Sequence, residues 1–318
     1  MSDCTMEEVK HTGMGTMMIH KAYGSNAKEA CNAVKAEAER LEATYSRFRQ
    51  ESIISRINRS AGIKNEVIHP EVSELISHAL EVSALSQGSF DVTIGPLVDL
   101  WDYKNAEEPP EEDKIQAILP LINYRDLELD ATNNIMGLKK PGQSIDLGGI
   151  AKGLSSDCFM KLFENYGVKS AFSNIGGNVS TLGSKPDGTD WKVGIRHPRQ
   201  SGLLGAVAVK GKAVVTSGDY ERFFIGKDGR RYHHILNPKT GYPAEAGLIS
   251  VTIVTERAML ADAFSTAIFT IGLEMGLDLL KAQPQLQAVI MDDKLTVYVT
   301  HGLKECFQAA DEINLKYI

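Results

Sequence analysis

Residues 261–267, ADAFSTA, open a long apolar segment that continues as IFTIGL at 268–273. An apolar run of this length predicts a buried helix. Asp262 and Thr266 are four residues apart, so a helix places both side chains on one face, one turn apart. A carboxylate in an apolar segment is unfavourable unless a partner satisfies it, so Asp262 requires an explanation.

Two interpretations of this stretch are open. In the first, Asp262 is the N-cap of the helix and Thr266 bonds back to its own helix. In the second, the two side chains hold a hard cation such as Mg²⁺, which prefers carboxylate and hydroxyl oxygens. The seven residues alone favour the capping interpretation, and the rest of the chain has to decide.

The bulk composition is that of a soluble globular protein. Of its 318 residues, 43% are hydrophobic and 24% are charged, which is ordinary for this class. We expect residues 1–318 to form a single domain, with room for two closely fused lobes. The net charge of −7 argues against a general nucleic-acid binder, because such proteins carry a basic surplus or stripe.

The four cysteines predict free thiols. Cys4, Cys31, Cys158 and Cys306 are far apart, so neither a zinc site nor a disulfide framework is expected. The sequence has no run of about 18 apolar residues, so we expect no transmembrane segment. The start of the chain lacks a signal-peptide core, and Cys4 follows no apolar segment. These features predict a cytoplasmic protein, or a periplasmic or membrane-anchored one if an export signal has been removed.

Helical and strand-like patterns follow one another without regular βαβ repetition, which predicts an α+β fold. Neither standard nucleotide loop, GxGxxG or GxxxxGK[ST], is present. Residues 104–115 are acidic and contain Pro109 and Pro110, which predicts a mobile surface loop. Periodicity predicts helices over 27–46, 71–87, 154–166 and the apolar segment, and strands over 14–22, 127–129, 135–139, 171–175, 191–196, 205–209, 212–217, 220–225, 231–236, 249–254 and a hairpin at 287–299.

The segment from Ser144 to Gly153 combines an acid, a glycine pair and a lysine at the start of a predicted helix. Adjacent glycines let a backbone approach a ligand closely, and a helix N-terminus favours anions. Asp146 and Lys152 are therefore candidates for a pocket that holds phosphate and base. The alternative is a tight turn from strand to helix with a solvated Lys152, and the segment alone does not decide between them.

His233 and His234 lie near the end of a predicted strand, before the turn signal from Asn237 to Gly241. Adjacent side chains on a strand point to opposite faces, so only one of the two faces a given site. A histidine at that position is suited to be a general base near neutral pH. A lone histidine is more often structural, and both interpretations remain open on this segment alone.

Eight such segments occur together, and in this order the chain resembles the ApbE family of flavin transferases. They span nearly the whole chain, so the resemblance is specific even though each segment alone is weak. The matching segments are Gly13 to Thr16, Ser46 to Ser52, Phe90 to Trp101, Ile145 to Gly153, Asn174 to Asn178, Thr216 to Tyr220, His234 to Gly241 and Ala261 to Ala267.

The resemblance implies an α+β architecture of the T-fold-like type and a Mg²⁺-dependent enzyme. It implies transfer of FMN from FAD to a Thr or Ser hydroxyl of an acceptor protein through a phosphoester bond, with release of AMP. Acceptors in the family include subunits of sodium-pumping quinone reductases and of Rnf complexes. Two alternatives are a Mg²⁺-dependent FAD pyrophosphatase that gives FMN and AMP, and a non-catalytic FAD-binding protein.

The resemblance also implies roles for individual residues. His234 matches the base that acts on the acceptor hydroxyl. Three positions depart from what many relatives carry: Phe48 stands where Tyr is frequent, Ser265 where some have Asp, and Asn237 where many have Asp. The implied FAD-contacting residues are Met14, Phe48, Ser89, Phe90, Asp91, Asp146, Lys152 and Leu236, and the implied metal ligands are the main-chain oxygen of Gly149 and the side chains of Asp262, Ser265 and Thr266.

Overall fold

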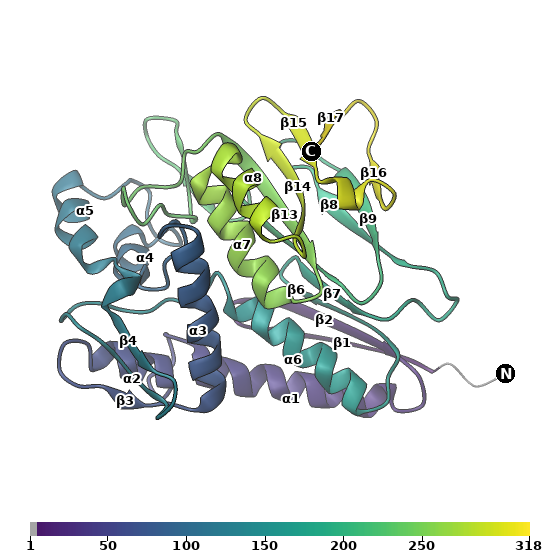
Figure 1. Cartoon of the computed structure of the whole chain (residues 1–318), viewed down its shortest axis with the longest axis horizontal. Helices are drawn as coiled ribbons and strands as arrows, with labels where there is room; N and C mark the ends of the chain where they lie inside the picture. The colour runs from purple at the N-terminus through teal and green to yellow at the C-terminus, as the bar shows by residue number, and fades with distance from the viewer. Residues whose placement is uncertain (1–4) are drawn as a thin grey trace.

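A central antiparallel sheet organises the protein, whose computed structural model describes residues 5–318 (Figure 1). Only its last pair, β15 with β17, is parallel. The strand order does not follow the chain, so segments distant in sequence become neighbours. In sheet order the strands are β1 (Met6–Gly13), β2 (Thr16–Tyr23), β6 (Ser170–Ile175), β7 (Asn178–Leu182), β10 (Ala213–Gly218), β13 (Leu248–Thr255), β14 (Gln287–Asp292), β15 (Thr296–Val299) and β17 (Asn314–Tyr317).

Helices cover one face of this sheet. They are α1 (Ala27–Tyr45), α6 (Ala151–Asn165), α7 (Ala258–Ile271) and, after a break at Gly272, α8 (Leu273–Ala282). A three-stranded sheet of β16 (Phe307–Ala309), β9 (Leu203–Val209) and β8 (Trp191–Arg196) packs on the other face. Every residue of β13 is buried, because Val251 and Ile253 pack toward the helices and Val254 toward the small sheet. A strand that is covered on both faces has a nearly continuous apolar sequence, which is why β13 is mostly apolar.

The remaining elements lie beside these layers, on the left of Figure 1. They are α2 (Ile53–Arg59), α3 (Pro70–Leu85), α4 (Gly95–Trp101), α5 (Glu112–Ile118) and a small sheet of β3 (Glu66–Val67), β5 (Ile135–Leu138) and β4 (Leu127–Asp130). Trp101 ties α4 to the loop before β13, because its indole Nε1 donates to the carbonyl oxygen of Gly241 at 2.7 Å. Its ring also packs on Tyr232 of β12 (Arg231–His233), which pairs with β11 (Phe223–Ile225) in a hairpin.

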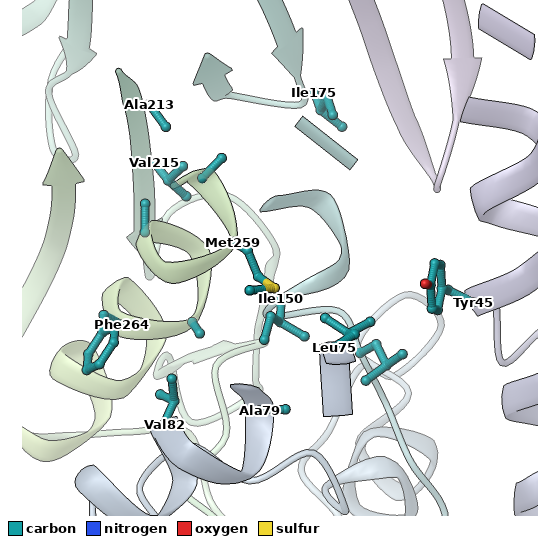
Figure 2. Close-up of a cluster of buried hydrophobic side chains, with 14 of the residues drawn as sticks. Tyr45, Leu75, Ala79, Val82, Ile150, Ile175, Ala213, Val215, Met259 and Phe264 are labelled. Atoms are coloured by element: carbon teal, nitrogen blue, oxygen red, sulfur yellow. The ribbon is translucent and has the colours of Figure 1, made fainter. Parts of the chain in front are cut away.

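Helices α6 and α7 make an unusually close contact. A Cβ on Gly153 of α6 would lie 2.4 Å from the carbonyl oxygen of Ala258, so only glycine allows this separation. Asp157, one turn further along α6, accepts the backbone N–H groups of Ala258 and Met259 at 2.7 and 3.1 Å and caps α7. Figure 2 shows Met259 beside Ile150 in the apolar cluster at this contact.

The α+β prediction is confirmed, and most predicted elements are present with shifted ends. Strands β1, β3, β7, β16 and β17 were not predicted. Strand β1 alternates between half-buried and exposed residues and lacks an apolar face. The predicted strands over 220–225 and 231–236 shrink to β11 and β12. The predicted loop over 104–115 is wrong at its end, where α5 begins at Glu112, because Ile115 is buried against Trp101 and its neighbours.

Within the described residues, no helix combines the length and the apolar character that crossing a bilayer requires. Cys31, Cys158 and Cys306 carry free thiols, as predicted. The prediction for Cys4 lies outside the described residues.

Candidate active site

Asp262 lies at the contact between α6 and α7 and is only 3% exposed. Its Oδ2 accepts the backbone N–H of Gly153 at 2.9 Å, and its Oδ1 accepts the side-chain amide of Asn178 at 3.0 Å. The ammonium of Lys152 is 3.4 Å from the same Oδ1 and also donates to the carbonyl oxygen of Gly148 at 2.8 Å. The buried carboxylate is thus satisfied by groups from α6 and β7, as a buried charge requires.

The capping interpretation of Asp262 is wrong. Helix α7 begins at Ala258, so Asp262 is the fifth residue of the helix, and Asp157 provides the cap instead. The second part of that interpretation holds, because the Thr266 hydroxyl donates to the main-chain oxygen of Asp262 at 3.3 Å. Helix α6 begins at Ala151, and so Lys152 lies at a helix N-terminus, as predicted.

Three hydroxyl groups meet beside Asp262, and we call Ser217, Ser265 and Thr266 the hydroxyl cluster. Oγ of Ser217, from β10, lies 2.8 Å from Oγ of Ser265 and 3.1 Å from Oγ1 of Thr266. Ser265 also donates to the main-chain oxygen of Asp262 at 2.9 Å. The hydroxyl cluster thus connects β10 to α7 through hydrogen bonds between hydroxyl oxygens.

The chain from 147 to 150 passes close to the hydroxyl cluster. A Cβ on Gly149 would lie 3.5 Å from Oγ1 of Thr266 and 3.1 Å from the ring of Phe90. Gly149 therefore places a bare backbone beside Thr266, with Phe90 on its other side. The donor set fits a hard cation, because carboxylate, hydroxyl and carbonyl oxygens are its preferred ligands. No set of three His, Cys, Asp or Glu side chains suited to a metal occurs among the described residues, so such a cation would also rely on substrate oxygens.

Asp146 is held from both sides. Its Oδ1 accepts the backbone N–H of Gly148 at 2.7 Å, and its Oδ2 accepts from Arg47 at 3.1 Å. The nearly buried guanidinium of Arg47 also donates to Asp99 and to the carbonyl oxygen of Gly95. Arg47 thereby fixes the carboxylate that begins the turn leading to Lys152.

A shallow pocket of about 300 Å³ lies near these segments. Phe48 is 75% exposed, and its ring carries the guanidinium of Arg47 on one side and the ammonium of Lys104 at 5.6 Å. Met14, at the tip of the β1–β2 hairpin, has the left-handed φ of 50° that a tight hairpin turn needs. The pocket is lined by Gly15, Tyr103, Lys104, Glu221, Arg222 and Phe223.

Three of the predicted FAD-contacting residues, Ser89, Asp91 and Leu236, have buried side chains. Asp91 accepts from the backbone N–H groups of Thr93 and Tyr124, each at 2.8 Å, and burial raises the pKa of its carboxyl. Leu236 packs in the small cluster around Trp101.

The two adjacent histidines have different environments, as the strand geometry predicts. Nε2 of His233 donates to the carbonyl oxygen of Ala244 at 3.1 Å, and its Nδ1 accepts the backbone N–H of Ile235 at 3.3 Å. His233 is therefore a structural, neutral histidine. His234 is half-buried, and its ring lies 5.8 Å from that of Tyr103, which lines the pocket.

His234 has the protonation state of a base. Its Nδ1 lies 3.2 Å from the carbonyl oxygen of Arg222, which can only accept, so Nδ1 carries the proton and Nε2 is free. Burial lowers the pKa of His234 to about 3, assisted by the positive charges of Arg222 and Lys152. Lys152 therefore lies near enough to His234 for its charge to act on the histidine.

Asn237 closes the turn after His234. Its Oδ1 accepts the backbone N–H of Lys239 at 2.9 Å, and its own backbone pairs with Tyr242 and Gly241. An Asp makes the same side-chain turn, so the amide at this position preserves the loop.

The fold brings together Lys152, Asp262, Thr266 and Gly149, with His234 near Lys152, while Phe48, Asp146 and Met14 lie on flanking segments. Sequence reasoning assigned no role to Arg47, Asn178, Ser217 or Asp157. The first three stand inside motifs that signalled the site. Asp157 has no sequence signal, because only the packing of α6 on α7 gives it a function.

Comparison with known proteins gives one consistent result. The model of the ApbE family matches residues 14–290. An FAD:protein FMN transferase of Klebsiella pneumoniae (strain 342) is 33% identical over 314 residues, covering 98% of this chain and 97% of that protein. One from Treponema pallidum (strain Nichols) is 31% identical over 318 residues, covering 94% and 88%. The crystal structure of the ApbE protein of Thermotoga maritima matches with a TM-score of 0.88 at 30% identity, covering 95% of this chain and 99% of that one.

Proposed function

The chain belongs to the ApbE family, and we propose that it is a Mg²⁺-dependent enzyme that transfers FMN from FAD to a Thr or Ser hydroxyl of an acceptor protein. The acceptor is a flavin-carrying subunit of the kind found in sodium-pumping quinone reductases or Rnf complexes. The observation that carries the proposal is the pairing of a neutral His234, with a free Nε2, and an oxygen-rich site around Asp262 within reach of Lys152.

The bond changes follow from this arrangement. The acceptor hydroxyl oxygen attacks the phosphorus on the FMN side of the FAD pyrophosphate, in line with the bond to AMP. A phosphoester bond forms, the pyrophosphate bond breaks, and AMP leaves. The acceptor proton passes to Nε2 of His234, which is unprotonated at neutral pH because burial lowers its pKa to about 3. General-base assistance of this kind contributes about 10²–10⁴ in rate.

The chain's own residues prepare the charge-bearing side of the reaction. Lys152, at the N-terminus of α6, stabilises negative charge that develops on phosphoryl oxygens, with help from the helix dipole. Asp262, Thr266 and the main chain at Gly149 would hold Mg²⁺, with Ser265 as the further ligand that the family resemblance implies. Bound Mg²⁺ would neutralise the pyrophosphate oxygens and orient them for in-line displacement. Met14, Phe48 and Asp146 would line the FAD site.

The proposal is tested with the purified chain, FAD, Mg²⁺ and a purified acceptor subunit. We expect a covalent FMN adduct on the acceptor, seen by mass spectrometry, with AMP in equal amount. His234→Ala should abolish the adduct while FAD still binds in a fluorescence titration. Normal flavinylation by this variant would remove His234 from the mechanism.

The same mixture without an acceptor separates transfer from hydrolysis. Rapid AMP release from FAD and Mg²⁺ alone identifies a pyrophosphatase that uses water in place of the hydroxyl. FAD that stays intact with and without acceptor identifies a binding protein.

A further inference from the structure

We propose that Ser217 of β10 presents a hydroxyl oxygen to the cation, and that Ser265 stands behind it and holds it in place. The inference rests on the proposed Mg²⁺ dependence and refines which side chains would ligate the ion. It moves a ligand from α7 to the central sheet, so the ion would join the two elements.

The burial of the three hydroxyl groups supports this order. Ser265 has no exposed surface, whereas Ser217 and Thr266 are both half-buried. An ion that also binds the pyrophosphate of a substrate must reach its ligands from the open side. Of the hydroxyl cluster, only Ser217 and Thr266 have surface on that side.

Counting protons in the hydroxyl cluster leads to the same assignment. A serine hydroxyl has one proton to donate and two lone pairs. Ser265 donates its proton to the main-chain oxygen of Asp262 at 2.9 Å, so in its 2.8 Å contact with Ser217 it must accept. Ser217 therefore spends its proton on Ser265. Because Thr266 donates its own proton to the main-chain oxygen of Asp262, the lone pairs of Ser217 are left for an incoming cation.

The position of Ser217 in β10 suits a ligand. It is paired with Val251 in the middle of the sheet and is the last side chain before Gly218, so its backbone is fixed. Its Oγ and Oγ1 of Thr266 are 3.1 Å apart, a separation that lets two oxygens share one small cation. The neighbouring Thr216 points to the other face of the sheet, where its hydroxyl pairs with that of Thr252 at 2.8 Å.

This arrangement also explains how a cation could bind although Ser265 stands where some relatives have Asp. At this position the site has a neutral hydroxyl, and Asp262, whose main-chain oxygen accepts from Ser265 and Thr266, carries the nearby carboxylate. Ser217 adds an oxygen without adding charge. We therefore expect weak cation binding by the protein alone and tighter binding with FAD, whose phosphates supply the missing negative charge.

Mn²⁺ binding, measured by electron paramagnetic resonance with the protein alone and with FAD, tests the assignment without depending on catalysis. We expect Ser217→Ala to weaken Mn²⁺ binding at least tenfold and Ser265→Ala to weaken it less than threefold. Thr216→Ala is the matched control, because it removes a hydroxyl from the same strand on the opposite face, and it should bind Mn²⁺ like the wild type.

Asp262→Ala separates this inference from the proposed function. If Asp262→Ala loses Mn²⁺ while Ser217→Ala binds normally, the ligand role of Ser217 is wrong and the metal site stands. If Asp262→Ala binds as the wild type does, or the wild type binds no Mn²⁺, both proposals are wrong.

Ser217→Cys gives a gain of function that misfolding cannot imitate. A thiolate prefers a soft ion such as Cd²⁺ to Mn²⁺, so Cd²⁺ should displace Mn²⁺ from this variant at least tenfold better than from the wild type. Ser265→Cys should show no such change. An enhanced Cd²⁺ preference in Ser265→Cys but not in Ser217→Cys would reverse the assignment.

Discussion

Gly153→Ala tests how tightly the site depends on the contact between α6 and α7. The new Cβ would lie 2.4 Å from the carbonyl oxygen of Ala258 and 2.6 Å from Cα of Met259, where ordinary contact begins at 3.4 Å. Both neighbours are backbone atoms, so side-chain rotation cannot relieve the overlap. The two helices must separate by about 1 Å, and overpacking of this kind costs about 1–3 kcal/mol.

The same displacement reaches Asp262. The hydrogen bond from the backbone N–H of Gly153 to Oδ2 of Asp262 is 2.9 Å long, and a 1 Å separation stretches it to about 3.9 Å, beyond hydrogen-bond range. A misplacement of about 1 Å in a catalytic site costs on the order of 10² in rate. We therefore expect a loss of up to about 2 kcal/mol in unfolding free energy, because alanine regains about 1 kcal/mol of helix propensity, and a hundredfold loss of activity.

Urea unfolding followed by the fluorescence of the buried Trp101 and Trp191 measures the first effect, and FMN transfer at saturating FAD measures the second. Gly276→Ala in α8 is the matched control. There the added Cβ meets the side-chain methyl of the buried Ile268 at 2.8 Å, not backbone. The overlap costs stability, but it involves no hydrogen bond of the site, so we expect full activity. A Gly153→Ala variant as stable and as active as the wild type would refute the reasoning.

Three further predictions concern charged groups at the site. Burial lowers the pKa of His234 to about 3, whereas an ordinary histidine titrates with a pKa of about 6.5. The plot of kcat/KM against pH should therefore show no loss of activity from protonation of His234 between pH 5 and 7. A loss of activity centred near pH 6.5 that disappears in His234→Gln would contradict the neutral base. Burial raises the pKa of Asp157 from 3.8 to about 6, so the folded protein holds this proton more tightly than the unfolded chain, and ionisation lowers stability as the pH rises from about 4 to above 6. Asp157→Asn lacks that loss, so urea unfolding should show wild type losing up to about 3 kcal/mol relative to the variant between pH 4 and 7, and a pH-independent difference would exclude it. Arg47→Met frees the carboxylate of Asp146 and should raise the Kd for FAD at least tenfold while Mn²⁺ binding is retained; unchanged FAD affinity would show that Arg47 serves only the fold.

The sequence predicted the fold class and the helical frame of the site because these depend on local patterns. The apolar segment after Asp262 forms α7, and the glycine-rich turn before Lys152 leads into α6. Strand β1 was not predicted, because it has no apolar face and forms through its pairing with β2. Helix α5 was not predicted, because the segment is acidic and Ile115 is the one buried residue that fixes it on the core.

The partners of the site residues could not be predicted, because the sheet order determines them. Asn178 reaches Asp262 across 84 positions of the chain, and Ser217 meets α7 only because β10 lies beside β13, on which α7 packs. Asp157 carries no signal in the sequence, yet it caps α7. Motifs indicated which segments converge, and only the packing shows which atoms meet.

One measurement tests the central claim most directly: intact-mass analysis of a purified Rnf-type or quinone-reductase acceptor subunit after incubation with this chain, FAD and Mg²⁺. We predict a mass increase of one FMN residue on a single Thr or Ser, one AMP released per adduct, and neither product with Asp262→Ala. AMP release without any mass increase on the acceptor would contradict FMN transfer and assign the chain to FAD hydrolysis.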